Sequence, residues 1–222
     1  MGKRKNYPAN LLEALQIQTE TQSDILHDEL SEDQYKGLEY AMSVLTEREK
    51  FVLNAYFAEG KTIREFSKEY NLSENRIKQI IDHALRKLRR NKEWLFYIVN
   101  GYEAQRQYLW KQLLHEERKY LVKHGIYDHS HLYYQEISVL NLPARIYNPL
   151  IKHGIRVVRD LVVFVCTYEK IRNFGEMSVQ VVCDVLKRNN LLPMDWQTQR
   201  NKKTDIPRLD LELNAFIALN RY

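Results

Sequence analysis

The protein has 222 residues, which is enough for two small domains that each bury a modest core. With 44% hydrophobic and 28% charged residues its composition excludes wholesale disorder, and the scarcity of glycine (7) and proline (5) favours an all-α fold. The net charge of +5 is a mild basic bias, so only a local cluster of basic residues would be good evidence for a nucleic-acid partner.

No segment of the sequence is typical of a membrane span or a leader peptide. The apolar run Leu161–Cys166 is far too short to cross a bilayer, and no apolar stretch follows the basic N-terminal tip. Cys166 and Cys183 lie in apolar surroundings with no His or Cys at ligand spacing, which is typical of buried thiols in a reducing cytosol. We therefore expect a cytoplasmic protein without a membrane partner.

The first part of the sequence is predicted to be an N-terminal arm over residues 1–34, followed by a helical domain over 35–91. Two capping boxes mark helix starts in that domain, Thr46 with Glu49 and Thr62 with Glu65. The second of these helices is expected to stop at Asn71, a residue type that tolerates the left-handed conformation of a sharp turn. Ser73 then caps the next helix.

The helix that follows Ser73 is amphipathic. Apolar residues recur at three- and four-residue spacing and should face inward: Ile77, Ile80, Ile81, Ala84, Leu85 and Leu88. Polar and basic residues point outward: Asn75, Lys78, Gln79, Asp82 and Arg86. A short helix, a tight turn and a second helix with a polar, basic face make a helix-turn-helix, whose second helix enters the major groove of DNA. The basic residues at the end of this helix, Arg86, Lys87, Arg89 and Arg90, are candidates for contacts with the DNA backbone.

This domain resembles region 4 of the primary bacterial sigma factors over about Tyr35–Asn91, because LTERE, TIREFSKEYNLSENRIKQI and ALRKLRR occur in the family's order and spacing. The resemblance implies that the domain reads the minus-thirty-five promoter element and rests on the flap of the polymerase beta subunit. It assigns DNA contacts to Arg76, Lys78 and Gln79, and Asn75 on the same turn is the fourth candidate for the major groove. Asn75 replaces a base-reading Glu and Glu74 replaces a basic residue, and these departures bear on sequence preference rather than on groove binding.

Residues 92–134 are predicted to form a helical linker, because Tyr102, Arg106, Trp110 and Leu113 or Leu114 recur at helical spacing. Its aromatic residues could stack on the bases of single-stranded nucleic acid, although packing in a core or between domains is the favoured interpretation. Its histidines, His115, His124, His129 and His131, match no zinc-binding pattern. We therefore expect no metal and no cofactor.

A second domain is predicted over residues 135–192. A helix over Ala144–His153 should stop at Gly154, and an apolar helix should start at Val158. The turn Ile171–Ser178, with Gly175 at a position where the backbone can run at positive φ, leads into a last helix, Val179–Arg188. This order predicts a helix-hairpin-helix, whose turn amides suit a phosphate.

The second domain resembles the C-terminal domain of the bacterial RNA polymerase alpha subunit, with LPARIYNPL as its first helix and KIRNFGEMS as its hairpin. The resemblance implies binding to the minor groove of A·T-rich DNA and contacts with sigma region 4 and with activators. It assigns the groove-inserting arginine to Arg145, a polar contact to Asn148, and the phosphate-binding turn to Gly175 and Ser178. The sequence departs from the family at three positions, Pro149, Met177 and Val181. Residues 193–222 are left as an unassigned tail.

We therefore expect a transcription regulator that binds double-stranded promoter DNA together with the RNA polymerase core, using a major-groove and a minor-groove reader in tandem. The alternative is an interaction protein that occupies the beta flap and competes with or remodels sigma with little DNA binding. Nothing in the sequence is similar to sigma region 2 or to the alpha assembly domain, so we expect neither a complete sigma factor nor a working alpha subunit. Without a nucleophile–base pair or a glycine-rich phosphate loop, neither an enzyme nor a small-molecule substrate is expected.

Overall fold

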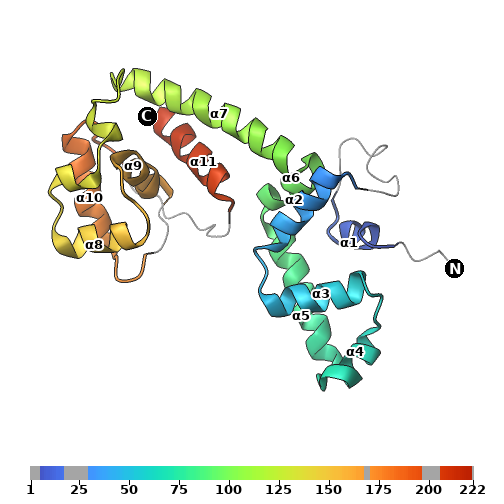
Figure 1. Cartoon of the computed structure of the whole chain (residues 1–222). Coiled ribbons are helices and arrows are strands. Elements are labelled where there is room, and N and C mark those ends of the chain that lie inside the picture. The colour runs from blue at the N-terminus through green and yellow to red at the C-terminus, as the bar shows by residue number, and fades with distance from the viewer. Residues whose placement is uncertain (1–5, 18–29, 168–170, 197–205, 222) are drawn as a thin grey trace. The chain divides into compact units, whose positions relative to one another are not determined.

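The computed structural model describes residues 6–17, 30–167, 171–196 and 206–221. Within these ranges the protein forms eleven α-helices and two short 3-10 helices, and it forms no strand beyond one isolated bridge between Glu136 and Val157 (Figure 1). The all-α prediction is confirmed. None of the described helices combines the length and the apolar character needed to cross a membrane.

The protein divides into two compact units, residues 1–107 and 108–222. The first unit contains α1 to α6 and the start of α7. The bounds of these helices are α1 Ala9–Ala14, α2 Glu32–Met42, α3 Glu47–Phe57, α4 Ile63–Tyr70, α5 Glu74–Arg90, α6 Lys92–Asn100 and α7 Tyr102–Lys123. The predicted linker over 92–134 is therefore divided between the units, because α6 belongs to the first and most of α7 to the second.

Helices outside the predicted helix-turn-helix share one hydrophobic core with it. In the first unit α2 packs closely against α6, and the lack of a side chain at Gly37 of α2 allows this approach. A Cβ atom at this position would lie 1.8 Å from the Tyr97 carbonyl oxygen. Leu11 and Leu15 of the N-terminal segment are buried in the same core as α3 and α5. The Asn10 side-chain amide also donates to the Phe57 carbonyl at 2.8 Å. Part of the predicted arm is thus integral to this unit.

The start of α7 is capped by a side chain from α2. Asp33 accepts hydrogen bonds from the backbone amides of Glu103 at 2.9 Å and Ala104 at 3.3 Å. These amides belong to the first turn of the helix, where no intrahelical partner exists and a negative charge is favourable. The contact fixes the beginning of α7 to the first unit.

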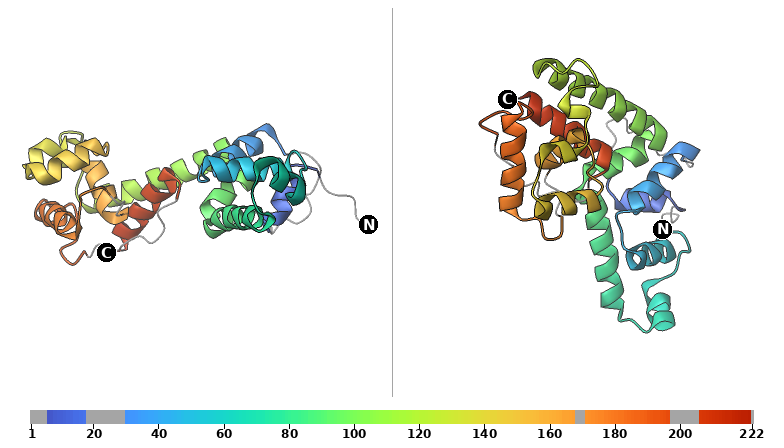
Figure 2. Two further views of the ribbon diagram at one scale, coloured as in Figure 1. Left: turned by 90° about the horizontal axis from the view of Figure 1, so that it is seen from below. Right: turned by 60° about the vertical axis from the view of Figure 1, so that its left-hand side comes forward.

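The second unit is built around α9, which is buried on nearly all sides. Its other elements are η1 Leu132–Tyr134, η2 Ile137–Leu140, α8 Ala144–Lys152, α9 Val158–Thr167, α10 Glu176–Arg188 and α11 Arg208–Asn220. From the predicted linker, Leu113, Tyr120 and Tyr133 enter the core, and α11 from the predicted tail packs against α9 (Figures 1 and 2). The unit therefore extends beyond the predicted limits 135–192 on both sides.

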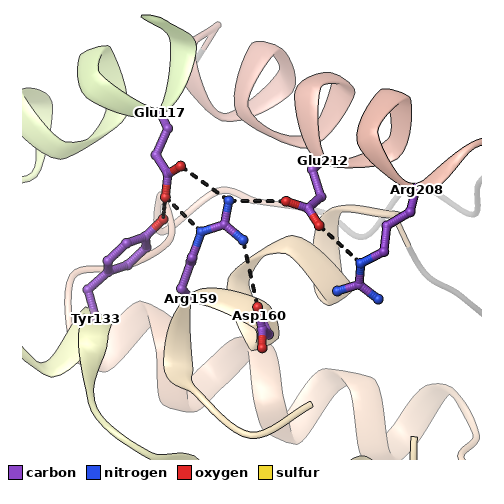
Figure 3. A network of polar contacts seen from close by, with 6 residues as sticks. All are labelled: Glu117, Tyr133, Arg159, Asp160, Arg208 and Glu212. Carbon is purple, nitrogen blue, oxygen red and sulfur yellow. Dashed lines mark hydrogen bonds and ion pairs between the residues drawn. The ribbon is translucent and has the colours of Figure 1, made fainter. Parts of the chain in front are cut away.

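A polar network centred on Arg159 joins these added elements to α9 (Figure 3). The Arg159 guanidinium donates to both carboxylate oxygens of Glu117 on α7, at 2.8 and 3.2 Å, and to Glu212 on α11 at 3.1 Å. Tyr133 donates to the same Glu117 at 2.7 Å. Burial by itself would lower the pKa of Arg159, but its hydrogen bonds and the charges of both glutamates outweigh burial and raise that pKa. Arg159 therefore stays charged and holds three helices together.

Candidate nucleic-acid interfaces

The turn between α4 and α5 has the geometry of a helix-turn-helix. At the end of α4, Asn71 takes the left-handed conformation with φ 50° and ψ 43°. The Ser67 hydroxyl donates to the Leu72 carbonyl at 2.5 Å, and the Ser73 hydroxyl accepts from the Arg76 amide at 3.2 Å. Both capping boxes are also present, at Thr46 and at Thr62. The predicted cap, turn and start of the second helix are confirmed.

The orientation of α5 agrees with its sequence pattern. All six apolar residues predicted to face inward are buried, and the outward positions Asn75, Lys78, Gln79, Asp82 and Arg86 are exposed. Because the hydrophobic side is anchored in the core of the first unit, the polar side is held in a fixed orientation toward solvent.

The four predicted base-reading residues gather at the beginning of α5. Asn75, Arg76, Lys78 and Gln79 are all exposed there. The Arg76 guanidinium donates to the Gln79 side-chain oxygen at 3.2 Å, so two planar polar groups are already oriented side by side. Glu74, also exposed, is the acidic residue of this first turn. The helix start therefore presents donors and acceptors of the kind that recognise base edges.

The four residues predicted to contact the DNA backbone do not share one environment. Arg86 and Arg90 are exposed and make no ion pair within the described part of the protein. Lys87 is half-buried and pairs with Glu49 of α3 at 3.0 Å, and the Arg89 guanidinium donates to the Leu85 carbonyl at 3.3 Å. Two of these four positive charges are thus already engaged inside the unit.

Glu49 has a second role that its capping box alone did not indicate. Its carboxylate lies against α5 and accepts hydrogen bonds from Lys87 at 3.0 Å and His83 at 2.7 Å. Burial opposes its ionisation, yet hydrogen bonds from the Thr46 amide, Lys87 and His83 prevail and lower the pKa of Glu49 to about 2. The only sequence signal for this contact is the placement of His83 and Lys87 four residues apart on one side of α5.

An aromatic patch on α3 and α4 was not foreseen from the sequence. Phe51 and Tyr70 are exposed and pack edge-on with ring centroids 5.2 Å apart, and both rings contact Phe66. Lys61 lies 5.8 Å from the centre of the Tyr70 ring. Aromatic side chains grouped at a surface beside a cation are typical of protein-binding sites.

In the second unit Arg145 and Asn148 lie three residues apart on the exposed side of α8. Neither makes a hydrogen bond or ion pair with the described residues. Pro149 lies inside α8 and has no amide hydrogen, so the carbonyl of Arg145 lacks its usual helical donor. The helix nevertheless continues to Lys152. Both side chains are therefore free to meet a ligand.

The hairpin turn differs from the prediction at Gly175. This residue has φ −88° and ψ 179°, an ordinary extended conformation, and the left-handed position is Asn173, with φ 61°. Asparagine tolerates that region, so glycine is not needed there. Gly175 is instead the N-cap of α10, which begins at Glu176 rather than at Val179 and has no side-chain cap. Ser178, half-buried, lies in the first turn of the same helix.

The candidate residues thus lie on three helices: at both ends of α5, on the exposed side of α8 and at the start of α10. Among the residues that the structure describes, no three His, Cys, Asp or Glu side chains gather closely enough to hold a metal ion. These residues offer a ligand cationic and amide side chains and the start of α10, which has no side-chain cap.

Comparison with known families matches each unit to a different model. Residues 41–90 match Sigma-70, region 4, and residues 126–188 match the C-terminal domain of the bacterial RNA polymerase alpha chain. Both resemblances are confirmed, in the predicted order. No curated protein and no solved structure matched the sequence. The two families indicate a DNA-binding role in transcription associated with RNA polymerase.

Proposed function

We propose that this protein, which joins a Sigma-70 region 4 domain to a C-terminal domain of the RNA polymerase alpha type, is a promoter-binding regulator without catalytic activity or cofactor. In this proposal α5 reads the major groove and α8 inserts Arg145 into the minor groove of A·T-rich DNA. The observation that carries the proposal is the capped start of α5, where four polar side chains lie exposed on a helix anchored in a core.

The chemistry of the α5 group suits base edges in the major groove. A guanidinium such as that of Arg76 matches guanine, and an amide such as that of Gln79 matches adenine, each by two hydrogen bonds. Their mutual hydrogen bond at 3.2 Å limits their rotamers before DNA arrives, which lowers the entropy cost of binding. Exposed Arg86 and Arg90 lie farther along the same helix, where they would hold phosphates.

The second unit supplies a different kind of contact. Arg145 is exposed and unpaired within the described residues, and a narrow A·T minor groove concentrates the negative potential that attracts such a side chain. The start of α10, which lacks a side-chain cap, is suited to an adjacent phosphate. Linking two weak readers raises the effective concentration of the second once the first has bound.

A selection from random duplexes tests this proposal. The full-length protein should enrich a major-groove motif together with an A·T-rich segment, and footprinting should show protection of both. If no sequence is enriched over the starting pool, sequence reading by α5 is ruled out.

A second candidate function is favoured by the aromatic patch Phe51–Phe66–Tyr70. Its rings suit a protein rather than a phosphate backbone, and it belongs to the domain whose resemblance to sigma region 4 implies contact with the polymerase beta flap. In this case the protein would compete with or remodel sigma and bind little DNA. The test is binding of nuclease-treated core RNA polymerase by the wild type and by Phe51→Ala. Loss of polymerase binding in the variant supports this candidate function. Equal binding by the two proteins excludes the patch as the polymerase-binding surface.

A further inference from the structure

One face of α7 in the second unit carries large apolar side chains in contact with solvent. The exposed fractions are 59% for Tyr108, 52% for Trp110, 49% for Leu114 and 57% for Val122. The helix itself is firmly packed, because Leu113 and Tyr120 on its opposite side are fully buried. Four such side chains on one helix are more than the scattered apolar residues of an ordinary surface.

The same face is basic. Exposed Lys111 and Arg118 alternate with the apolar residues, and neither forms an ion pair within the described part of the protein. The acidic residues of this stretch point elsewhere: Glu116 accepts from the Asn220 side chain at 2.8 Å and Glu117 binds Arg159 at 2.8 Å. The outer face of α7 is therefore defined by six residues, which are Tyr108, Trp110, Lys111, Leu114, Arg118 and Val122.

The spacing of these residues suits a second helix. Lys111, Leu114 and Arg118 follow one another at three and four residues, and Trp110 stands four residues before Leu114. Residues at this spacing form a continuous ridge along a helix. Such a ridge can pack into a groove between the side chains of an amphipathic partner helix. The apolar side of the partner would bury the four apolar side chains of this face. Acidic residues beside that apolar side would pair with Lys111 and Arg118.

We propose that the outer face of α7 binds an acidic amphipathic helix of another protein. The charges argue against a second copy of this protein, because two basic faces would repel each other. The aliphatic side chains argue against single-stranded nucleic acid, since Leu114 and Val122 have no ring on which a base can stack. A partner with apolar residues flanked by Asp or Glu satisfies both features of the face. The inference does not depend on DNA binding by α5 or α8.

Trp110 makes the proposal measurable. The protein has three tryptophans, and the other two, Trp94 and Trp196, are only 7% and 5% exposed. Acrylamide quenching of the full-length protein therefore reports mainly on Trp110, and Trp110→Phe identifies its share. Cover by a partner helix should shift the emission to shorter wavelength and reduce quenching at least twofold.

The probe is a display library of helical peptides with one side varied among Leu, Ile, Phe, Asp, Glu, Lys and Arg, selected on the full-length protein. Selection against Trp110→Ala/Leu114→Ala removes peptides that bind elsewhere. Enriched peptides should carry Asp or Glu beside the apolar positions, and an enriched peptide should protect Trp110. Enrichment of Lys or Arg, or no enrichment over the counter-selected variant, overturns the proposal.

Charge reversal supplies the decisive control. The double variant Lys111→Glu/Arg118→Glu should bind the acidic peptide at least tenfold more weakly than the wild type does. It should instead bind a version of the peptide that carries Lys in place of the acidic residues. Arg188→Glu, which changes an exposed charge on α10, should leave affinity within twofold of wild type. Equal weakening by both variants would mean that only net charge matters. Protection of Trp110 by a single-stranded oligonucleotide but not by the peptide would assign the face to nucleic acid. Concentration-dependent self-association through the face would assign it to a second copy of the protein. Each of these three outcomes overturns the proposal.

Discussion

Lys78 and Gln79 provide the sharpest test of base reading at the scale of single residues. Both are exposed at the start of α5 and neither belongs to the core, so their replacement by Ala should leave the fold intact. Each lost base contact should cost about 1–3 kcal/mol of binding free energy, and the double variant should no longer distinguish the selected duplex from random DNA. A fluorescence titration with both duplexes measures this. Arg188→Ala controls for the loss of charge, and a double variant with full sequence preference would show that α5 is not the reader.

Glu49 predicts how the stability of the first unit depends on pH. Its pKa falls from 4.5 to about 2 on folding, so the unfolded state takes up the proton first as the solution is acidified. The stabilisation is therefore complete above about pH 4.5 and is lost progressively between that value and about 2. Glu49→Gln should cost about 1–3 kcal/mol at neutral pH and remove much of this dependence. Hydrogen exchange of the α5 amides in the wild type and in Glu49→Gln, measured at pH 7 and pH 3.5, tests the cost and its pH dependence. If the substitution lowers the stability equally at the two pH values, the prediction is contradicted.

At the scale of elements, the contact between α2 and α6 depends on the absence of a side chain at Gly37. A Cβ atom there would lie 1.8 Å from the Tyr97 carbonyl oxygen, so Gly37→Ala must push the two helices apart. Overpacking of this kind costs about 1–3 kcal/mol, which urea unfolding can resolve. Gly175→Ala is the matched control, because its added Cβ meets no atom within 4 Å and should cost below about 1 kcal/mol. Equal costs in the two variants would show that α2 and α6 tolerate separation.

The elements also show which features a sequence can predict. Caps and periodicity are local, so the starts of α3, α4 and α5 and the buried side of α5 were predictable from a few neighbouring residues. Tertiary contacts are not local. The only signal for the pairing of Glu49 lies 34 to 38 residues away, in His83 and Lys87 of α5, and the packing of α11 on α9 has no signal in its own segment. At Gly175 the prediction was wrong because Asn173 supplies the left-handed position and glycine was assumed to be required for it.

At the scale of the whole molecule, the dependence of DNA affinity on salt reports how many cations contact phosphates. Lys87 is paired with Glu49, so the exposed cations of α5 that remain are Arg76, Lys78, Arg86 and Arg90. If each of these four cations neutralises one phosphate, including Arg76 and Lys78 beside the bases that they read, log affinity should fall linearly with log salt with a slope of about −3.6 from this helix. Arg86→Ala should reduce the slope by about 0.9, whereas Lys87→Ala should change it less. A flat response between low and moderate salt would favour the polymerase-binding alternative.

Arg145 separates the contributions of the two units to DNA binding. It is exposed on α8 with Asn148 on the same side, and its side chain makes no hydrogen bond or ion pair with the described residues, so its removal breaks no such contact there. An arginine gains affinity from the narrow groove of A·T-rich DNA and carries little direct base code there. Arg145→Ala should therefore weaken binding to a probe with A·T-rich flanks about tenfold, equivalent to about 1.4 kcal/mol.

The comparison probe for Arg145→Ala contains only the major-groove site. Binding to this probe should stay within twofold of wild type, because the contacts of α5 are untouched. Lys152→Ala removes another exposed charge from α8 and so controls for a general electrostatic effect. It should weaken binding to the A·T-rich probe less than Arg145→Ala does. Equal loss on both probes would mean that Arg145 supports the fold rather than the groove. An unchanged affinity for both would mean that the second unit contacts protein instead of DNA, since no minor-groove contact would then contribute to binding.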